Sequence, residues 1–453
     1  MKTALQWTLT SLLLACLAGS TYGQDWPQWR GKNRDGKAMD FTPPKSWPKE
    51  LTQKWKVTVG DGVATPALVG DRLFVFSREE GNEVLRCLDA GSGKELWLDK
   101  YETQGAQGAA ASFSGPRSSP TVAEGKVVTL GVRGALSCLD AKSGKKLWRK
   151  EDIRGWPNFF TSSSPLVANG LVIAQLGGRD NGMTAAFDLT SGEEKWKASD
   201  STPAYASPVM MQVGGMNLVL VVTDGKIVAL NAADGKQVWE TPFKAQGMGG
   251  YNAATPIVDG QTIYYSGSRR GVKAVKLEKG AEGITAKESW NNAEKSVQFN
   301  SPVLKDGFIY GLTDKDELFC LNTQDGKTAW SAPISEAPAV GNPPPGPAAV
   351  APGAEGERPP GGNRPPGGGG PGGGRRGGGG GGRAGYGSVV DAGKVMMALT
   401  PNSRLIVFEP NGKEFKRVAS YKVAPSATHA YPIASGNRIF IKDKDSVILW
   451  TVD

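Results

Sequence analysis

The chain has 453 residues, of which 39% are hydrophobic, and lysine plus arginine exceed aspartate plus glutamate by 53 to 44. The resulting formal charge of +9 is diffuse, because no run of five or six basic residues occurs, and this argues against the clustered basic face of a nucleic-acid-binding protein. A chain of this length suffices for two or three ordinary domains or for one long all-β domain.

Residues 1–23 have the pattern of a secretory signal peptide. A lysine near the start is followed by an apolar run and then by small residues, and the run is too short for a stop-transfer helix. Two processing routes are open: cleavage before Gln24, or a bacterial lipobox, LLAC at 13–16, that would place a lipid on Cys16. We therefore expect an exported protein of the periplasm or cell envelope with no membrane span, either soluble or lipid-anchored.

An eleven-residue phrase recurs along the chain, each time after a short apolar phrase such as ATPALVGDRLFVF or NSPVLKDGFIYGL. The copies are CLDAGSGKELW at 87–97, CLDAKSGKKLW at 138–148, AFDLTSGEEKW at 186–196, ALNAADGKQVW at 229–239 and CLNTQDGKTAW at 320–330, with a looser copy that ends at Trp290. Their tryptophans follow one another at intervals of 51, 48, 43, 51 and 40 residues. A period of forty to fifty residues with several short strands per repeat is typical of propeller blades.

The phrase itself predicts a structural element. Its aspartate or asparagine opens a tight turn, its glycine takes a positive φ, and its tryptophan then lies on the outer strand of the blade. Because aspartate exchanges with asparagine between the copies, the shared property is a hydrogen-bond acceptor rather than an acid. We expect the tryptophans to dock neighbouring blades against one another: Trp55, Trp97, Trp148, Trp196, Trp239, Trp290 and Trp330.

The repeats predict an all-β fold, an eight-bladed β-propeller of four-stranded antiparallel blades. The last blade supplies only three strands before the chain stops, and LTQKWKV at 51–57 looks like its missing outer strand. An N-terminal strand that completes the last blade closes the ring and removes its free edges. We assign residues 24–50 to a segment that packs on the propeller and residues 51–453 to the propeller itself.

One segment interrupts the propeller. Residues 335–387 are dominated by glycine, proline and arginine and cannot bury enough apolar surface to offset the entropy of ordering. We expect a disordered insertion between the sixth and seventh blades.

The insertion also marks one rim of the ring, because the connections between successive blades all emerge on one side. Other connections on this rim are long and carry aromatic residues that the strand pattern does not explain. These candidate partner-binding residues are Tyr101, Trp156, Phe159, Phe160 and Tyr251. Two interpretations are open: the rings bind a partner, or they pack over the mouth of the central channel.

The residues that could suggest metal or acid–base chemistry have simpler explanations. Cys87, Cys138 and Cys320 occupy the small-residue position that is alanine in sister repeats, so equivalent cysteines lie a blade apart, too far for a disulfide. We expect three buried free thiols and no metal site. His429 is the only histidine, and we expect it to pack or to bond a turn rather than to act as a base.

The repeat, x-L-D-A-x-S-G-K-x-x-W, resembles the pyrroloquinoline-quinone (PQQ) repeat of quinoprotein-alcohol-dehydrogenase-like eight-bladed propellers. The resemblance covers residues 64–330 and, more weakly, 388–453. The segment DWPQWRGKNRDG at 25–36 is similar to the leader of exported PQQ-like propeller proteins. The repeat is specific for the fold and unspecific for function, because it is the element that docks the tryptophan.

The resemblance implies two functions. The first is a non-catalytic, monomeric binding scaffold for protein partners in the cell envelope, similar to the propeller lipoprotein of outer-membrane assembly, with no cofactor and no catalytic residues. The alternative is a PQQ- and calcium-dependent dehydrogenase of alcohols or sugars. That family has adjacent cysteines beside its quinone and, in some members, a Cys-x-x-Cys-His haem motif, and this sequence contains neither. We therefore expect the scaffold.

Overall fold

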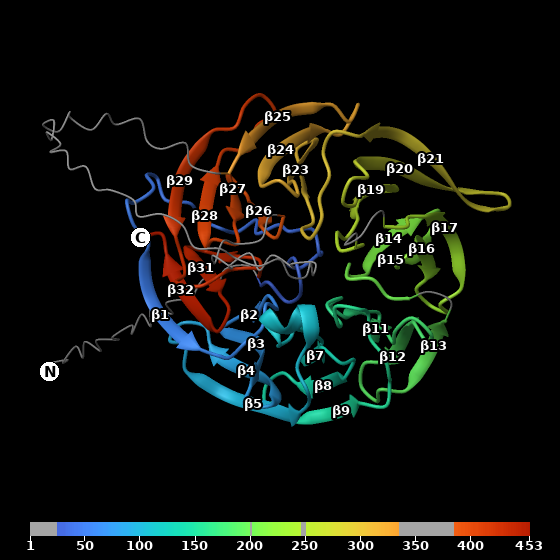
Figure 1. Cartoon of the computed structure of the whole chain (residues 1–453), viewed down its shortest axis with the longest axis horizontal. Coiled ribbons are helices and arrows are strands. Elements are labelled where there is room, and N and C mark those ends of the chain that lie inside the picture. Colours follow the sequence, from blue (N-terminus) through green and yellow to red (C-terminus); the bar gives the residue numbers. More distant parts are fainter. Residues whose placement is uncertain (1–24, 200–201, 246–250, 335–384) are drawn as a thin grey trace, which may run out of the picture.

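The computed structural model describes residues 25–199, 202–245, 251–334 and 385–453. The expected signal peptide, Cys16 and nearly all of the expected insertion lie outside these ranges. The described chain forms eight four-stranded antiparallel sheets arranged in a ring (Figure 1). The prediction of an eight-bladed β-propeller is confirmed.

The blades follow one another in chain order, and each runs from an inner strand to an outer strand. Blades 1 to 4 contain β2 (Ala67–Val69), β3 (Arg72–Glu79), β4 (Asn82–Asp89) and β5 (Glu95–Glu102); β6 (Thr121–Ala123), β7 (Lys126–Leu130), β8 (Leu136–Asp140) and β9 (Lys146–Lys150); β10 (Leu166–Ala168), β11 (Leu171–Leu176), β12 (Met183–Asp188) and β13 (Glu194–Ala198); and β14 (Val209–Val213), β15 (Met216–Val222), β16 (Lys226–Asn231) and β17 (Gln237–Pro242). Blades 5 to 8 contain β18 (Ile257–Asp259), β19 (Thr262–Ser266), β20 (Val272–Gly280) and β21 (Gly283–Asn292); β22 (Val303–Lys305), β23 (Phe308–Leu312), β24 (Glu317–Asn322) and β25 (Thr328–Pro333); β26 (Ser388–Ala392), β27 (Val395–Leu399), β28 (Arg404–Phe408) and β29 (Arg417–Lys422); and β30 (Ile433–Ser435), β31 (Arg438–Lys442), β32 (Ser446–Thr451) and β1 (Thr52–Thr58). A short 3-10 helix, η1 (Gly108–Phe113), lies between blades 1 and 2.

The ring closes as the sequence predicts. β1 pairs antiparallel with β32, so that Thr52 lies opposite Thr451 and Thr58 opposite Ser446. The N-terminal strand thus becomes the outer strand of blade 8, and β32 is paired on both sides instead of being an edge of that sheet.

A closed circuit of hydrogen bonds, which we call the hydroxyl ring, joins the starts of the inner strands. At each step a backbone N–H of one blade donates to a side-chain hydroxyl of another blade, and all of these groups are buried. The seven bonds run from Thr65 to Ser119 (3.1 Å), Ser119 to Ser164 (2.9 Å), Ser164 to Ser207 (2.9 Å), Ser207 to Thr255 (2.9 Å), Thr255 to Ser301 (2.9 Å), Ser301 to Tyr431 (3.2 Å) and Tyr431 back to Thr65 (2.9 Å).

The circuit bypasses blade 7. Ser388 begins the inner strand of that blade, but its buried hydroxyl takes no part in the ring. The longer side chain of Tyr431, from blade 8, instead carries its hydroxyl across to the backbone N–H of Ser301 in blade 6. A phenol therefore spans the blade at which the serine and threonine pattern is interrupted.

The repeated tryptophan packs on the turn of the next blade. Five indoles donate to a backbone carbonyl there: Trp55 to Ala90 (3.3 Å), Trp148 to Leu189 (3.1 Å), Trp196 to Ala232 (3.1 Å), Trp290 to Thr323 (2.7 Å) and Trp330 to Asn411 (2.8 Å). The turn glycine lies directly beneath the ring, and a Cβ built on Gly144 would lie 2.5 Å from the Trp97 ring. The glycine is therefore required by its φ of +73° and also by the indole above it.

Two blades depart from this pattern. Blade 5 lacks the glycine turn, and its β20–β21 hairpin extends to a tip between Gly280 and Gly283 that projects from the ring (Figure 1). In blade 7 the outer-strand position that holds tryptophan elsewhere is Ala419, opposite Val407. The interface that follows blade 7 therefore lacks an indole from the blade's own outer strand.

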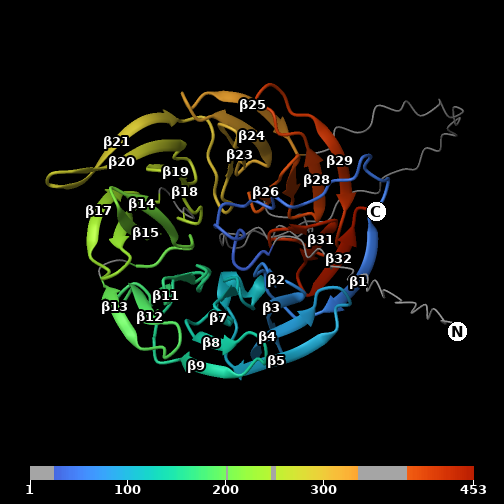
Figure 2. The ribbon, with the colours of Figure 1, turned by 180° about the vertical axis from the view of Figure 1, so that it is seen from behind.

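The N-terminal segment places two arginines among the inner strands. Figure 2 shows its chain running toward the middle of the molecule. The Arg34 guanidinium donates to the carbonyls of Ser164 (3.2 Å), Pro165 and Pro208 (2.9 Å), in two different blades. Arg30 donates to the carbonyl of Pro302 (2.6 Å) in a third blade. Both side chains are buried, and burial lowers the pKa of Arg34 to about 9.

The three thiols are buried and free, as the sequence predicts for residues 87, 138 and 320. Burial raises the pKa of each thiol to about 12 from an ordinary value of 9.0. The folded state holds these protons more tightly than the unfolded chain does. The contribution of the protonated thiols to the free energy of unfolding is therefore complete below pH 9 and is lost as pH rises toward 12.

Gly144→Ala should destabilise the fold more than Gly125→Ala, as measured by urea unfolding. Both glycines have a φ near +70°, but a Cβ at Gly125 meets nothing within 4 Å, whereas one at Gly144 meets the Trp97 ring. The positive φ costs roughly 1–2 kcal/mol in both variants, and overpacking against the indole adds about 1–3 kcal/mol at Gly144. The difference should vanish in a Trp97→Ala background, and equal losses in the wild-type background would contradict the docking of this indole.

Arg34→Met should lower the free energy of unfolding by roughly 2–4 kcal/mol, because it leaves the buried carbonyls of Ser164 and Pro208 without this donor. The carbonyl of Pro165 keeps its bond from the Thr121 hydroxyl (2.7 Å). Arg417→Met, at an exposed position on β29, is the control and should change it by less than about 0.5 kcal/mol. Equal effects of the two substitutions in thermal or urea unfolding would show that Arg34 does not hold the blades together.

The double variant Cys87→Ala/Cys138→Ala should lose stability less steeply than the wild type above pH 9. Alanine fills the same position in blades 3 and 4, so the substitution is tolerated locally. Each thiol removed should flatten the curve by a slope that approaches about 1.4 kcal/mol per pH unit. If the free energies of unfolding of the variant and of the wild type fall in parallel from pH 8 to 10.5, the pKa values of the two thiols are not raised in the folded state.

Candidate functional site

The connections from each outer strand to the next inner strand lie on one side of the ring, which we call the crossover side. This follows from four antiparallel strands per blade, which place the turns within the inner and the outer strand pairs on the opposite, hairpin side. The N-terminal segment lies along the hairpin side, where Trp26 bonds the carbonyl of Leu68 (2.7 Å) and Thr42 that of Gly436 (2.8 Å). The crossover side is therefore not covered by this segment.

Three aromatic residues from three successive connections meet on the crossover side, and we call them the Phe159 cluster. The Phe159 ring lies 4.7 Å from that of Tyr251 and 6.4 Å from that of Tyr205, and the two tyrosine rings are 5.8 Å apart. The Tyr205 hydroxyl accepts the backbone N–H of Phe159 (3.1 Å), and burial raises its pKa to about 12. Each of the three residues stays partly exposed, so the cluster is both ordered and accessible.

Trp156 and Phe160 form a second contact on this side. Their rings stack at 5.6 Å with an angle of 11°, and the guanidinium of Arg133 lies 4.5 Å from the indole. Phe160 is buried against Val132, whereas Trp156 is only partly buried. The structure thus places Phe160 within the packed interior and leaves Trp156 and Arg133 at the surface.

Tyr101 belongs to a different network. It lies at the end of β5 rather than in a connection, and its hydroxyl donates to the buried carboxyl of Glu83, which also accepts the backbone N–H of Val132 (2.8 Å). Arg149 of blade 2 lies 4.1 Å above the Tyr101 ring. Burial raises the pKa of Glu83 and of Tyr101. Tyr101 therefore joins blades 1 and 2, and its hydroxyl is not accessible to a partner.

Rings from further connections on the crossover side also contact one another. His429 lies edge-on to Phe113 of η1 (4.7 Å) and to Tyr386 (5.2 Å), and Tyr386 stacks on Phe299 (4.1 Å). The helix that carries Phe113 is the cyan turn near the centre of Figure 1. His429 thus packs among aromatic rings.

A sequence signal for these residues exists. In four blades, an aromatic or imidazole side chain stands two positions before the hydroxyl residue at the start of the inner strand. These residues are Tyr205, Phe299, Tyr386 and His429. The repeat therefore brings a ring to the crossover side in several blades. Because these connections vary in length, the period of the repeat alone does not reveal the shared position.

Arg117 lies beside this group and is held by the chain around it. Its guanidinium donates to the carbonyls of Ala110 (3.1 Å) and Phe113 (2.8 Å), and burial lowers its pKa. The neighbouring carboxylate of Asp61 accepts both the N–H (2.7 Å) and the hydroxyl (2.6 Å) of Ser114. These bonds fix η1 over the end of the axis.

Within the ranges that the structure describes, no group of three or more histidine, cysteine, aspartate or glutamate side chains could hold a metal ion. None of the helices there is long and apolar enough to cross a bilayer.

Comparison with known proteins places these observations in a family. The family model described as "Outer membrane protein assembly factor BamB" matches residues 46–150 and 81–332. The BamB of Burkholderia pseudomallei is 25% identical over 292 residues, which cover 63% of this chain and 60% of that protein. The chain thus spans about three fifths of the length of that relative.

Two solved structures have the same fold. The BamB of Moraxella catarrhalis superposes with a TM-score of 0.56 at 14% identity, over 88% of this chain and 99% of that one. The quinohemoprotein alcohol dehydrogenase of Comamonas testosteroni superposes with a TM-score of 0.60, also at 14% identity, over 94% of this chain and 80% of that one. At these identities the likeness concerns the fold alone.

Proposed function

The chain belongs to the family of the outer membrane protein assembly factor BamB, and on this basis we propose that it is a non-catalytic binding scaffold for a protein partner in the cell envelope. The partner binds on the crossover side, and no cofactor takes part. The name of the relatives concerns the assembly of outer membrane proteins, which supports an exported protein with a partner in the envelope. Processing at Cys16 or before Gln24 remains a prediction.

The observation that carries this proposal is the Phe159 cluster. Partly exposed aromatic residues dominate the binding energy of protein interfaces, because a large ring buries much area and loses little side-chain entropy. Phe159, Tyr205 and Tyr251 come from three different connections, yet their rings contact one another directly. Each connection ends at an inner strand whose start the hydroxyl ring holds in place, so a partner meets a surface that is already ordered.

Trp156 and Arg133 extend this surface. An indole with a guanidinium over its face offers both apolar area and charged donors, and tryptophan and arginine are enriched at the centres of interfaces. Since the Arg133 Nε already donates to the carbonyl of Gln104 (3.1 Å), the stack is held in position before a partner arrives.

The packing at the axis supports a scaffold rather than a quinone-dependent dehydrogenase. A planar cofactor stacked between two side chains needs about 7 Å between them, because each contact takes about 3.5–4.0 Å. The rings of Phe113, His429 and Tyr386 follow one another at 4.7 and 5.2 Å, so these residues do not fit a quinone between them. The sequence also has no adjacent cysteine pair.

A photo-cross-linking amino acid at Tyr251 or Trp156 tests the proposal in envelope extracts. We expect adducts with one or a few defined proteins, at least tenfold more abundant than from the same amino acid at Lys197, an exposed position on β13. Phe159→Ala/Tyr251→Ala should weaken the captured partner's binding at least tenfold, because it removes two anchoring rings. Thermal unfolding of each variant checks that the propeller remains folded.

Two outcomes would overturn the proposal. One is equal adduct formation from the crossover side and from Lys197. The other is reduction of an artificial electron acceptor with an alcohol or sugar after the full chain has been supplied with PQQ and calcium, which would assign the chain to the dehydrogenases.

A further inference from the structure

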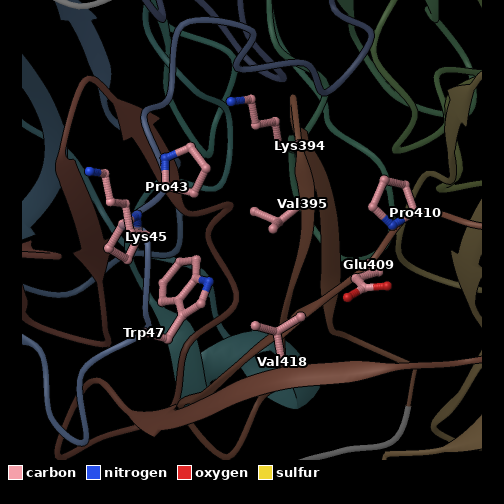
Figure 3. Close-up of a pocket in the computed structure, with 9 residues that line it drawn as sticks. Pro43, Lys45, Trp47, Lys394, Val395, Glu409, Pro410 and Val418 are labelled. Carbon is pink, nitrogen blue, oxygen red and sulfur yellow. The ribbon is translucent and has the colours of Figure 1, made fainter.

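A pocket of about 440 Å³ opens on the hairpin side, between the N-terminal segment and blade 7 (Figure 3). Its apolar wall consists of Trp47, three prolines and two valines. The lining residues are Pro43, Pro44, Lys45, Trp47, Lys394, Val395, Glu409, Pro410 and Val418. Its volume falls within the range of roughly 300–1,000 Å³ that is usual for small-molecule sites.

The pocket lies where the tryptophan repeat is interrupted. The outer strand of blade 7 carries Ala419 in place of the indole. Trp47 of the N-terminal segment instead packs over this blade, stacked on Phe41 (6.3 Å, 22°) and 6.2 Å from Tyr421, whose hydroxyl donates to the carbonyl of Pro48 (2.7 Å). These contacts fix the indole at the wall of the pocket and leave the neighbouring Val418 38% exposed.

The charges around the pocket are unbalanced. Glu409 forms an ion pair with Lys416 (2.7 Å), so its carboxylate is already compensated. Lys45 and Lys394 both line the pocket and lie on adjacent sides of it in Figure 3. Neither pairs with a carboxylate in the part of the chain that the structure describes. The pocket therefore presents two ammonium groups around an apolar floor, which favours an anion.

We propose that this pocket binds small aromatic carboxylates. A planar ring of the ligand packs against the Trp47 indole and the proline rings, and its carboxylate accepts hydrogen bonds from the ammonium groups of Lys45 and Lys394. An aliphatic acid would gain the charge interaction without the ring contact, and a neutral aromatic molecule would gain the ring contact alone. The site is separate from the crossover side, so it does not depend on the function proposed for that side.

Isothermal titration of the full chain with 4-hydroxycinnamate tests this proposal. We expect saturable binding with one site per chain, at least fivefold tighter than binding of 4-hydroxycinnamamide or of cyclohexanecarboxylate. Lys394→Gln should weaken binding about two- to fivefold, because an exposed ion pair contributes up to about 1 kcal/mol. Raising the sodium chloride concentration from 20 to 200 mM should also weaken it.

Trp47→Leu should abolish the preference for the aromatic acid over the aliphatic one. Because Trp47 also packs against Phe41 and Tyr421, Lys394→Gln serves as the variant that does not disturb the fold. Lys56→Gln, at an exposed position on β1, is the control and should bind like the wild type. Absence of saturable binding, equal binding of the three compounds, or equal effects of Lys394→Gln and Lys56→Gln would overturn the proposal.

Discussion

The hydroxyl ring is the interaction on which the rest of this structure depends. In most blades the hydroxyl residue is followed by proline, which has no N–H and holds the residue before it in an extended conformation. The N–H and the side chain of that residue are thereby aimed at two different neighbours. Each of the seven participating blades can then donate to one blade and accept from another, and the seven bonds close into a circle. A circle of this kind is satisfied only when every participating blade is in place.

The arginines of the N-terminal segment bind further backbone groups at the starts of the inner strands. The hydroxyl ring uses the backbone N–H groups at the starts of the inner strands, and Arg34 and Arg30 bind carbonyls of the same residues or of the prolines that follow them. Side chains of the chain itself therefore pair with both the N–H groups and the carbonyls at the starts of these inner strands. A segment that looks like a leader in the sequence is in fact part of the core of the propeller.

The sequence can vary more on the crossover side of the ring than on the hairpin side. On the hairpin side the turns must keep glycine beneath an indole, so they vary little, and a pocket opens beside blade 7, where the indole is absent. On the crossover side the connections carry no such constraint, and they hold the partly exposed rings of the Phe159 cluster and Trp156. A rigid ring with variable connections is suited to binding, because loops can change without cost to the core.

The sequence by itself determined the number of blades, the glycine turns, the docking position of the tryptophans, the buried thiols and the closure by residues 51–57. These features repeat at a fixed period or depend on neighbours a few residues away, so a local pattern reports them. Only the tertiary structure decided that Tyr431 reaches over blade 7, that Arg34 binds three carbonyls in two blades, and that Tyr101 is enclosed while Phe159 and Tyr251 meet. Such partners come from different blades, up to 366 residues apart for Tyr431 and Thr65, and their contact depends on how the whole ring curves.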